Sequence, residues 1–442
     1  MQPPPSSLLD RFNHRMKRSV TVKLIAIAFL ILLLLIPSSM VSDLIYERLN
    51  LRDEAVKEVS AKWGDEQVIT GPVVSIPYKY TYKTEEGKMM VGKSNLHLLP
   101  DQLDIDGDIV PEKRHRGIYI IVLYKGKFKI KGNFPKTDLA QLGILPSDLF
   151  LNEASVSMGI TDMKGIKTLA FKLNDTILDT EPGVLDVDIY SSGIHASLAP
   201  DLLKQTLMFD IDLELNGSSA INFAPFGKET KVHLTSKWGD PKFQGDFLPT
   251  HTTTPQGFTA DWKVLQLNRN YPQKGTGDFI KNVADFGVRL LLPVDEYQKT
   301  IRSSKYGIMF IVITFLSFFF IEIINKKPIH TVQYLLVGFA IVLFYVLLLS
   351  ISEHLSFDMS YLISSVAILA LITCYVYFLF RNKLLTTIFS GILALLYGFF
   401  YSLLQLQDYA LLMGSVGLFI ILAVIMHLTR NIDWYNLNNE ES

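Results

Sequence analysis

Four ionisable side chains in the C-terminal half of the chain could form one polar cluster. They are Glu353, His354, Asp358 and Asp408, and each follows or precedes a long apolar segment. If these apolar segments cross a membrane, the connections that carry the four residues lie on the same side of it. Carboxylates and an imidazole together could bind a divalent cation or relay protons. Polar loops also contain such residues by chance, and the sequence leaves both interpretations open.

Glu322 lies inside an apolar segment, where an ionisable side chain is costly and often functional. It also precedes Lys326 by four residues, so a salt bridge along one helix, reaching toward the membrane interface, would account for it equally well. The sequence therefore predicts either a functional intramembrane acid or a paired interfacial one.

The densest basic run of the polar region comprises Lys113, Arg114 and Arg116, with His115 among them. Cations gathered in this way could contact the phosphates of lipid headgroups or an anionic polysaccharide. The same charges could instead protect the edge of a β-hairpin from pairing with other chains. Both interpretations remain open.

Composition and motifs argue against several classes of protein. The 442-residue chain has a formal net charge of −1, whereas nucleic-acid binding requires a basic surface. The dinucleotide-binding, zinc-protease and hydrolase motifs G-x-G-x-x-G, H-E-x-x-H and G-x-S-x-G do not occur. The single cysteine, Cys374, lies in an apolar segment. We predict no enzyme, no cofactor and no nucleic-acid partner, and leave metal binding open.

Six apolar segments are long enough to cross a bilayer, because about 20 helical residues span its hydrocarbon core. The segments are Val20–Val41, Tyr306–Ile324, Val332–Ser350, Tyr361–Phe380, Leu384–Leu404 and Tyr409–Leu428. Short connections make the last five antiparallel neighbours. The arrangement predicts one transmembrane helix, a large inserted domain and then five transmembrane helices.

The distribution of basic residues predicts the orientation of these segments. Basic residues occur in the N-terminal tail, at Lys326 and Lys327, at Arg381 and Lys383, and at Arg430. The positive-inside rule therefore places both termini in the cytoplasm and the inserted domain outside it. A cleaved signal peptide is the alternative for the first segment, since a basic start followed by an apolar run is typical of one.

Alternating apolar and polar residues predict that the inserted domain is mainly β-structure. Met208–Leu215 alternates strictly, Asn216-Gly217 is typical of a turn, and Ala220–Phe223 resumes the pattern. Further strand candidates are Ile118–Tyr124, Lys127–Lys131, Val156–Ile160 and Leu169–Leu173. A β-sandwich or one long twisted sheet would accommodate these strands.

Helical spacing flanks this β-rich region, over Asp43–Trp63 before it and over Phe279–Lys305 after it. The sequence thus predicts an α+β membrane protein with six transmembrane helices and a large, mainly-β extracytoplasmic domain. Its parts are a cytoplasmic tail (1–19), a transmembrane helix (20–41), the β domain with its flanking helices (43–305), a five-helix bundle (306–429) and a cytoplasmic tail (430–442).

Short strings over nearly the whole chain after Asp43 match one family pattern. In the polar half they are Arg116-Gly117-Ile118-Tyr119, Ser236-Lys237-Trp238, Gly257-Phe258 and Pro293-Val294-Asp295. In the apolar half they are His330–Gly338, Leu349–His354, Asp408–Leu412, Thr429-Arg430 and Asp433-Trp434-Tyr435. The chain resembles the CreD family of bacterial inner-membrane proteins, also described as cell envelope integrity proteins. Thr331 stands where the family usually has proline, and Lys242 where it often has serine.

The resemblance implies a multi-pass protein of a bacterial inner membrane, with a periplasmic domain and a role in envelope stress or permeability. It supplies no catalytic residues. Our leading hypothesis is a protein that supports cell envelope integrity through its periplasmic β domain, with membrane lipids and envelope glycan, lipid or protein as partners. The alternative is a transporter of small solutes or lipids in the transmembrane bundle.

Overall fold

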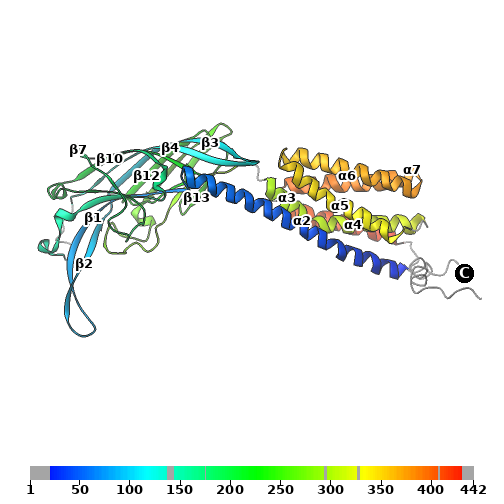
Figure 1. Cartoon of the computed structure of the whole chain (residues 1–442), viewed down its shortest axis with the longest axis horizontal. Helices are drawn as coiled ribbons and strands as arrows, with labels where there is room; N and C mark the ends of the chain where they lie inside the picture. The colour runs from blue at the N-terminus through cyan, green and yellow to red at the C-terminus, as the bar shows by residue number, and fades with distance from the viewer. Residues whose placement is uncertain are drawn as a thin grey trace, which may run out of the picture. The chain divides into compact units, whose positions relative to one another are not determined.

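The structure is a computed structural model of the chain, and it describes residues 20–136, 144–174, 176–292, 296–325, 329–406 and 409–430. The chain divides into two compact units. One unit comprises Met1–Leu51 and Val294–Ser442, and the other comprises Arg52–Pro293. Figure 1 shows helices in the first unit and mainly strands in the second.

The first described element is one long helix, α2 (Val20–Trp63). It continues without a break from the apolar segment near the N-terminus to Trp63. The predicted helix over Asp43–Trp63 is therefore confirmed. Pro37 lies inside α2 and removes one backbone hydrogen bond. The hydroxyl of Ser39 donates to the carbonyl of Ile36, three residues earlier in the same helix, at 2.8 Å.

The strands form two sheets. In the first sheet the order is β13-β17-β11-β1-β5-β9-β8, with β2 on β1 and β16 on β2. Its strands are β1 (Gln67–Lys83), β2 (Met89–Leu98), β5 (Ser155–Ile160), β8 (Glu181–Pro182), β9 (Gly193–Ser197), β11 (Ala220–Phe223), β13 (Pro241–Gly245), β16 (Lys274–Thr276) and β17 (Phe286–Leu290).

In the second sheet the order is β14-β15-β12-β3-β4-β10-β6-β7. Its strands are β3 (Gln102–Arg116), β4 (Tyr119–Phe134), β6 (Ile166–Leu173), β7 (Thr176–Ile177), β10 (Leu207–Ser218), β12 (Glu229–Ser236), β14 (Thr250–Thr254) and β15 (Gly257–Leu265). The two predicted strands on either side of Gly126 are one continuous strand, β4.

The two sheets enclose one hydrophobic core, as a β-sandwich does. In β10 the side chains of Phe209, Ile211 and Leu213 are buried there, while the acidic residues between them face outward. Burying each such side chain contributes roughly 1.5–3 kcal/mol, which explains why strict alternation specifies the face of the strand. The predicted mainly-β domain is therefore present.

The predicted turn at Asn216-Gly217 is wrong. β10 continues through both residues, which pair with Lys125 and Tyr124 of β4, and the chain turns at Ser219, where φ is 58°. β11 then joins the other sheet, between β1 and β17. A Cβ at Gly217 would collide with the Tyr124 side chain, so the glycine permits close packing there rather than a turn.

The predicted helical course of Phe279–Lys305 is wrong over Phe286–Leu290, which forms β17. This strand lies between β11 and β13 and pairs with both. Because an internal strand can be buried on both faces, its apolar residues need not alternate, and their spacing can imitate that of a helix. The end of the segment is helical, in α3 (Glu296–Lys305).

Further helices follow α3: α4 (Gly307–Asn325), α5 (Thr331–Ser352), α6 (Phe357–Phe380), α7 (Lys383–Gln405) and α8 (Ala410–Thr429). In the described residues, four helices are long and apolar enough to cross a membrane: α2, α5, α6 and α7. The pair α3–α4, bent by 44°, would make a fifth, and Leu411–His427 is a shorter apolar helix. The count of six spans stays a prediction.

Candidate functional site

The buried carboxylate of Glu322, near the end of α4, has three partners. Lys23 of α2 forms an ion pair with its Oε1, and the Ile329 backbone N–H donates to the same oxygen at 2.9 Å. The Tyr334 hydroxyl donates to Oε2 at 3.0 Å. The Glu322 side chain is 9% exposed. Lys326, the predicted partner, lies outside the described residues, and the cation that the structure describes comes from another helix.

These contacts join α2, α4 and α5 at one point. The rings of Phe315 and Phe318 pack against Tyr334 with centroids 5.4 and 5.6 Å apart, which holds its hydroxyl toward the carboxylate. A buried ion pair is tolerated when hydrogen bonds satisfy its remaining polar atoms, and this carboxylate meets that condition. The geometry thus explains how Glu322 is stabilised, while its role as a functional acid stays a prediction.

The polar loop residues have separate partners. Glu353 follows α5, and its Oε1 lies 3.5 Å from Nε of Arg48 in α2. His354 comes next, and its backbone N–H donates to the carbonyl of Ile351 at 3.0 Å. Asp408 lies outside the described residues. The structure therefore connects the first carboxylate of the predicted cluster to α2.

Asp358 lies in the first turn of α6 and accepts a hydrogen bond from the side-chain amide of Gln405 at the end of α7. Lys299 of α3 donates to the Gln405 side-chain oxygen at 3.0 Å. Arg302, also in α3, donates to the carbonyl of Leu406 at 3.2 Å. The two described carboxylates thus have different neighbours, and a common site for the four residues stays a prediction.

The predicted basic run lies at the end of the β3–β4 hairpin, and its side chains have partners within the β domain. The guanidinium of Arg114 lies over the Trp63 ring, 4.2 Å from its centroid, and also pairs with Glu112 at 2.8 Å. Arg116 pairs with Glu58 at 3.1 Å. The Nζ atom of Lys113 lies 5.1 Å from the centroid of the Trp238 ring. Arg114 and Arg116 therefore hold the end of α2 against the β3–β4 hairpin. Contact of the basic run with an anionic ligand stays a prediction.

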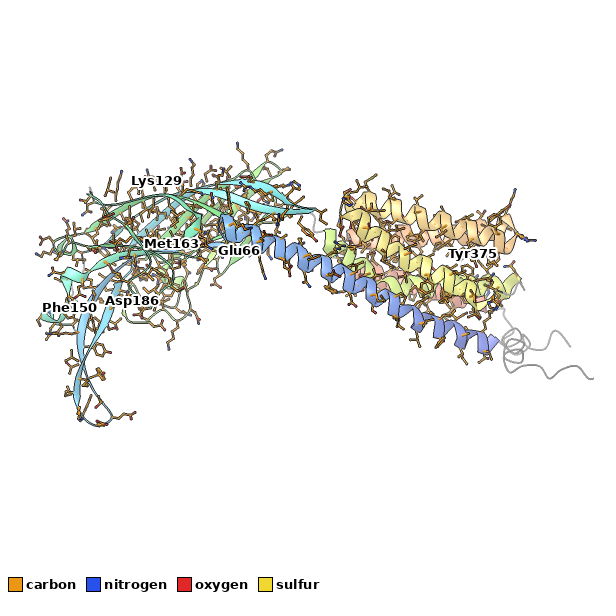
Figure 2. All side chains as sticks on the ribbon, viewed as in Figure 1. Glu66, Lys129, Phe150, Met163, Asp186 and Tyr375 are labelled. Carbon is orange, nitrogen blue, oxygen red and sulfur yellow. The ribbon has the colours of Figure 1, made fainter. Side chains whose placement is uncertain are left out.

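The outer face of the second sheet carries a groove of about 730 Å³. Its charged residues come from β3, β4, β12 and β15: Asp104, Asp106, Lys129, Lys131, Lys231, Asp261 and Lys263. Acids flank both lysines that β4 contributes to the groove, on both neighbouring strands. For example, Lys129, labelled in Figure 2, lies between Asp106 of β3 and Asp212 of β10. The groove thus offers donors and acceptors to a polar ligand without a large excess of either charge.

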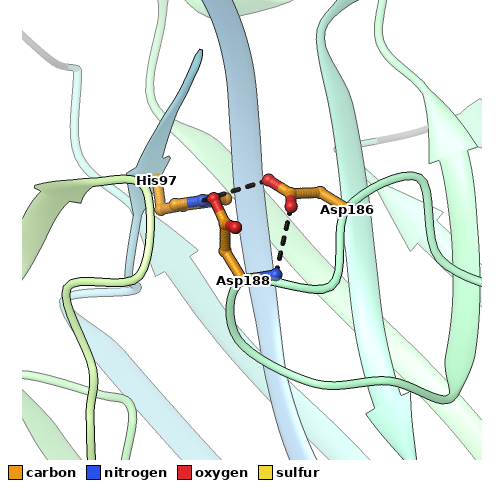
Figure 3. A group of neighbouring side chains, drawn as sticks. All are labelled: His97, Asp186 and Asp188. Atoms are coloured by element: carbon orange, nitrogen blue, oxygen red, sulfur yellow. Dashed lines mark hydrogen bonds and ion pairs between the residues drawn. The ribbon is translucent and has the colours of Figure 1, made fainter.

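A second group of polar side chains comes from β2 of the first sheet and from the connection between β8 and β9 (Figure 3). Nε2 of His97 lies 3.3 Å from a carboxylate oxygen of Asp186 and 3.5 Å from one of Asp188. Burial lowers the pKa of His97 below its usual value, although both carboxylates oppose this effect. Burial and the neighbouring Asp186 raise the pKa of Asp188. The potential ligand atoms of the three side chains all lie within 4.8 Å of one another.

The sequence did not indicate this group. His97 is on β2, whereas the aspartates lie between β8 and β9, and only sheet pairing brings these segments together. The local signal was the D-x-D string at Asp186 and Asp188, which is too short to predict a ligand without a known third residue.

The chain is similar to known inner membrane proteins over most of its length. A family model described as inner membrane protein CreD matches residues 19–435. The chain is also 33% identical over 414 residues to Inner membrane protein CreD of Escherichia coli (strain K12), which covers 92% of this chain and 91% of that protein. The resemblance predicted from short strings is therefore confirmed over nearly the whole length. With its large sheet-rich unit and its several apolar helices, the chain belongs to the CreD family of inner membrane proteins.

Proposed function

We propose that this protein supports the integrity of the cell envelope through its β domain, which lies in the periplasm and contacts a lipid, glycan or protein of the envelope. The observation that carries the proposal is the charge-lined groove on the outer face of the second sheet. Its lysines and aspartates could bind phosphate, hydroxyl and amide groups, which are common to envelope molecules. In this proposal the transmembrane helices anchor the domain, both termini are cytoplasmic, and no catalysis is required.

Packing within the helices supports an anchoring role over the alternative of a transporter. The Phe310 ring lies 4.4 Å from that of Tyr397, and the Phe318 ring lies 4.4 Å from that of Phe389, measured between centroids. These rings join α4 to α7 with aromatic side chains in direct contact. A transport path would instead need polar residues around a water-accessible cavity.

The test compares two pairs of substitutions in cells that lack their own copy of the protein. Lys231→Ala with Lys263→Ala removes two cations of the groove, and Lys88→Ala with Lys204→Ala removes two exposed cations elsewhere on the β domain. Exposed ion pairs contribute only about 0–1 kcal/mol, so both proteins should reach normal membrane levels. We expect the groove variant to leave cells sensitive to detergent and antimicrobial compounds, and the control variant to restore resistance.

Wild-type resistance with the groove variant would contradict this proposal. Substitutions in the predicted polar cluster test the alternative of a transporter: Glu353→Gln, His354→Ala, Asp358→Asn and Asp408→Asn. If these variants lose resistance at normal membrane levels while the groove variant remains functional, the transporter becomes the better explanation.

A further inference from the structure

We propose that His97, Asp186 and Asp188 form a binding site for one divalent transition-metal ion, of which Zn²⁺ is the representative. The site shares no residue with the groove, and it does not depend on the proposed function. It is built from one imidazole nitrogen and two carboxylate oxygens, with one position left for water or another ligand.

The fold places the imidazole firmly. His97 pairs with Ser75 of β1 on one side and with Gly275 of β16 on the other. The Ser75 hydroxyl lies 2.9 Å from Nδ1 of His97, and the Phe279 ring stacks on the imidazole with centroids 6.0 Å apart. When Nδ1 donates its proton to the serine, Nε2 directs a lone pair toward the two aspartates. Such a hydrogen bond to the second ring nitrogen is typical of histidines that bind metals.

The distances fit a metal ion better than a direct hydrogen bond. Nitrogen and oxygen ligands lie about 2.0–2.2 Å from Zn²⁺, so in a tetrahedral site they are about 3.3–3.6 Å from one another. The distances of 3.3 and 3.5 Å from His97 Nε2 to the two aspartates agree with this separation. A hydrogen bond between an imidazolium and a carboxylate would be shorter, at about 2.7–2.9 Å.

An unsatisfied polar atom points into the same place. The His97 side chain is 2% exposed, and its Nε2 is buried without a hydrogen-bond partner among the described residues. Buried polar atoms are nearly always satisfied, so the atom requires a partner. A metal ion between Nε2 and the carboxylates would supply one.

The charge of the group also favours a cation. With a neutral imidazole and two carboxylates, the group has a formal charge of −2. In the described part of the chain, no lysine or arginine forms an ion pair with Asp186 or Asp188, and the basic side chain next to both of them is His97. A divalent ion would neutralise both carboxylates.

The aspartates are oriented and remain accessible. The Asn95 side chain donates to Asp186 Oδ2, and the backbone N–H of Asp188 donates to Asp186 Oδ1 at 3.0 Å. The Asp186 and Asp188 side chains are 16% and 29% exposed, so an ion could enter from that side. Imidazole nitrogen favours Zn²⁺ and similar ions over Mg²⁺ and Ca²⁺, which prefer oxygen ligands only.

The experiment measures Zn²⁺ binding to the full-length protein in detergent, after removal of any affinity tag and of bound metal with a chelator. Titration against a chromophoric zinc chelator gives the stoichiometry and Kd, and Co²⁺ provides an absorption spectrum that reports its ligands. We expect one Zn²⁺ per chain and a rise in melting temperature upon binding. His97→Gln and Asp188→Asn should each weaken binding at least about tenfold, because each removes a ligand.

The matched control is His233→Gln with Asp261→Asn, which removes another imidazole and carboxylate of the β domain, paired at 2.7 Å. This variant should bind Zn²⁺ like the wild type. The melting temperature of each metal-free variant shows whether it is folded, and Asp188→Asn should fold normally because its side chain is partly exposed. Absence of binding to the wild type, or equal binding by the wild type, His97→Gln and Asp188→Asn, would overturn the proposal.

Discussion

Glu322 is removed from water and is stabilised by neighbouring groups instead. Lys23 supplies the opposite charge, and Tyr334 and the Ile329 backbone supply hydrogen bonds to the two oxygens. Removing either charged partner alone would leave a buried, uncompensated charge, whereas removing both would leave none. The stability that Lys23 contributes should therefore depend on the presence of Glu322, and the stability that Glu322 contributes should depend on Lys23.

We predict that Lys23→Met and Glu322→Leu each lower the free energy of unfolding by about 3 kcal/mol, and that the double variant loses much less than the sum. Unfolding of the full chain in detergent, followed by circular dichroism, measures this double-mutant cycle. Thr387→Ala, an exposed site on α7, serves as a control that should leave stability unchanged. Additive losses in the double variant would show that the two side chains do not depend on each other.

At the scale of elements, β17 depends on a close approach between strands. It lies between β11 and β13, and Gly287 pairs with Asn222 on one side and with Gln244 on the other. A Cβ at Gly287 would collide with the backbone oxygen of Ile221. The backbone cannot move away easily, because pairing on both sides holds it.

We predict that Gly287→Ala destabilises the β domain by about 1–3 kcal/mol, the usual cost of overpacking. The free energy of unfolding and the rate of limited proteolysis of the full chain both measure this effect. The control is Gly117→Asn in the β3–β4 turn, where φ is 61° and no heavy atom lies within 4 Å of the added Cβ. Asparagine tolerates this conformation, so Gly117→Asn should have little effect. Equal stability of both variants and the wild type would contradict the proposed packing of β17.

At the scale of the whole molecule, the chain passes from a helical unit to a β-rich unit and back again. Residues of α2 belong to both compact units, and the chain returns to the first unit after Pro293. The first unit contains the apolar helices, while the second has a core of its own between two sheets. The β domain is therefore joined at both ends to the unit that contains the apolar helices.

We predict that the β domain is periplasmic and that both termini are cytoplasmic, because basic residues concentrate in connections on one side of the apolar segments. Alkaline phosphatase, which is active only outside the cytoplasm, tests this orientation. A fusion after Lys237 should be active, and a fusion after Lys327 should be inactive. The opposite pattern would contradict the orientation and the periplasmic part of the proposed function.

The sequence by itself determined the kinds of element and their broad order. Apolar runs such as Val332–Ser350 and Leu384–Leu404 correspond to α5 and α7, because the thickness of a bilayer sets the length of a spanning helix. The alternation of Met208–Leu215 corresponds to β10, because one face of that strand is buried and the other is exposed. The family was also recognisable, since short strings retain their order along the chain.

Only the tertiary structure decided which distant segments meet. It paired Lys23 with Glu322, and it brought His97 to Asp186 and Asp188. It also placed β17 inside a sheet, although its apolar spacing resembles that of a helix. Local periodicity reports whether a residue is buried but not what buries it. Strand pairing and helix packing join residues far apart in the chain, and these contacts determine the partners of each buried charge.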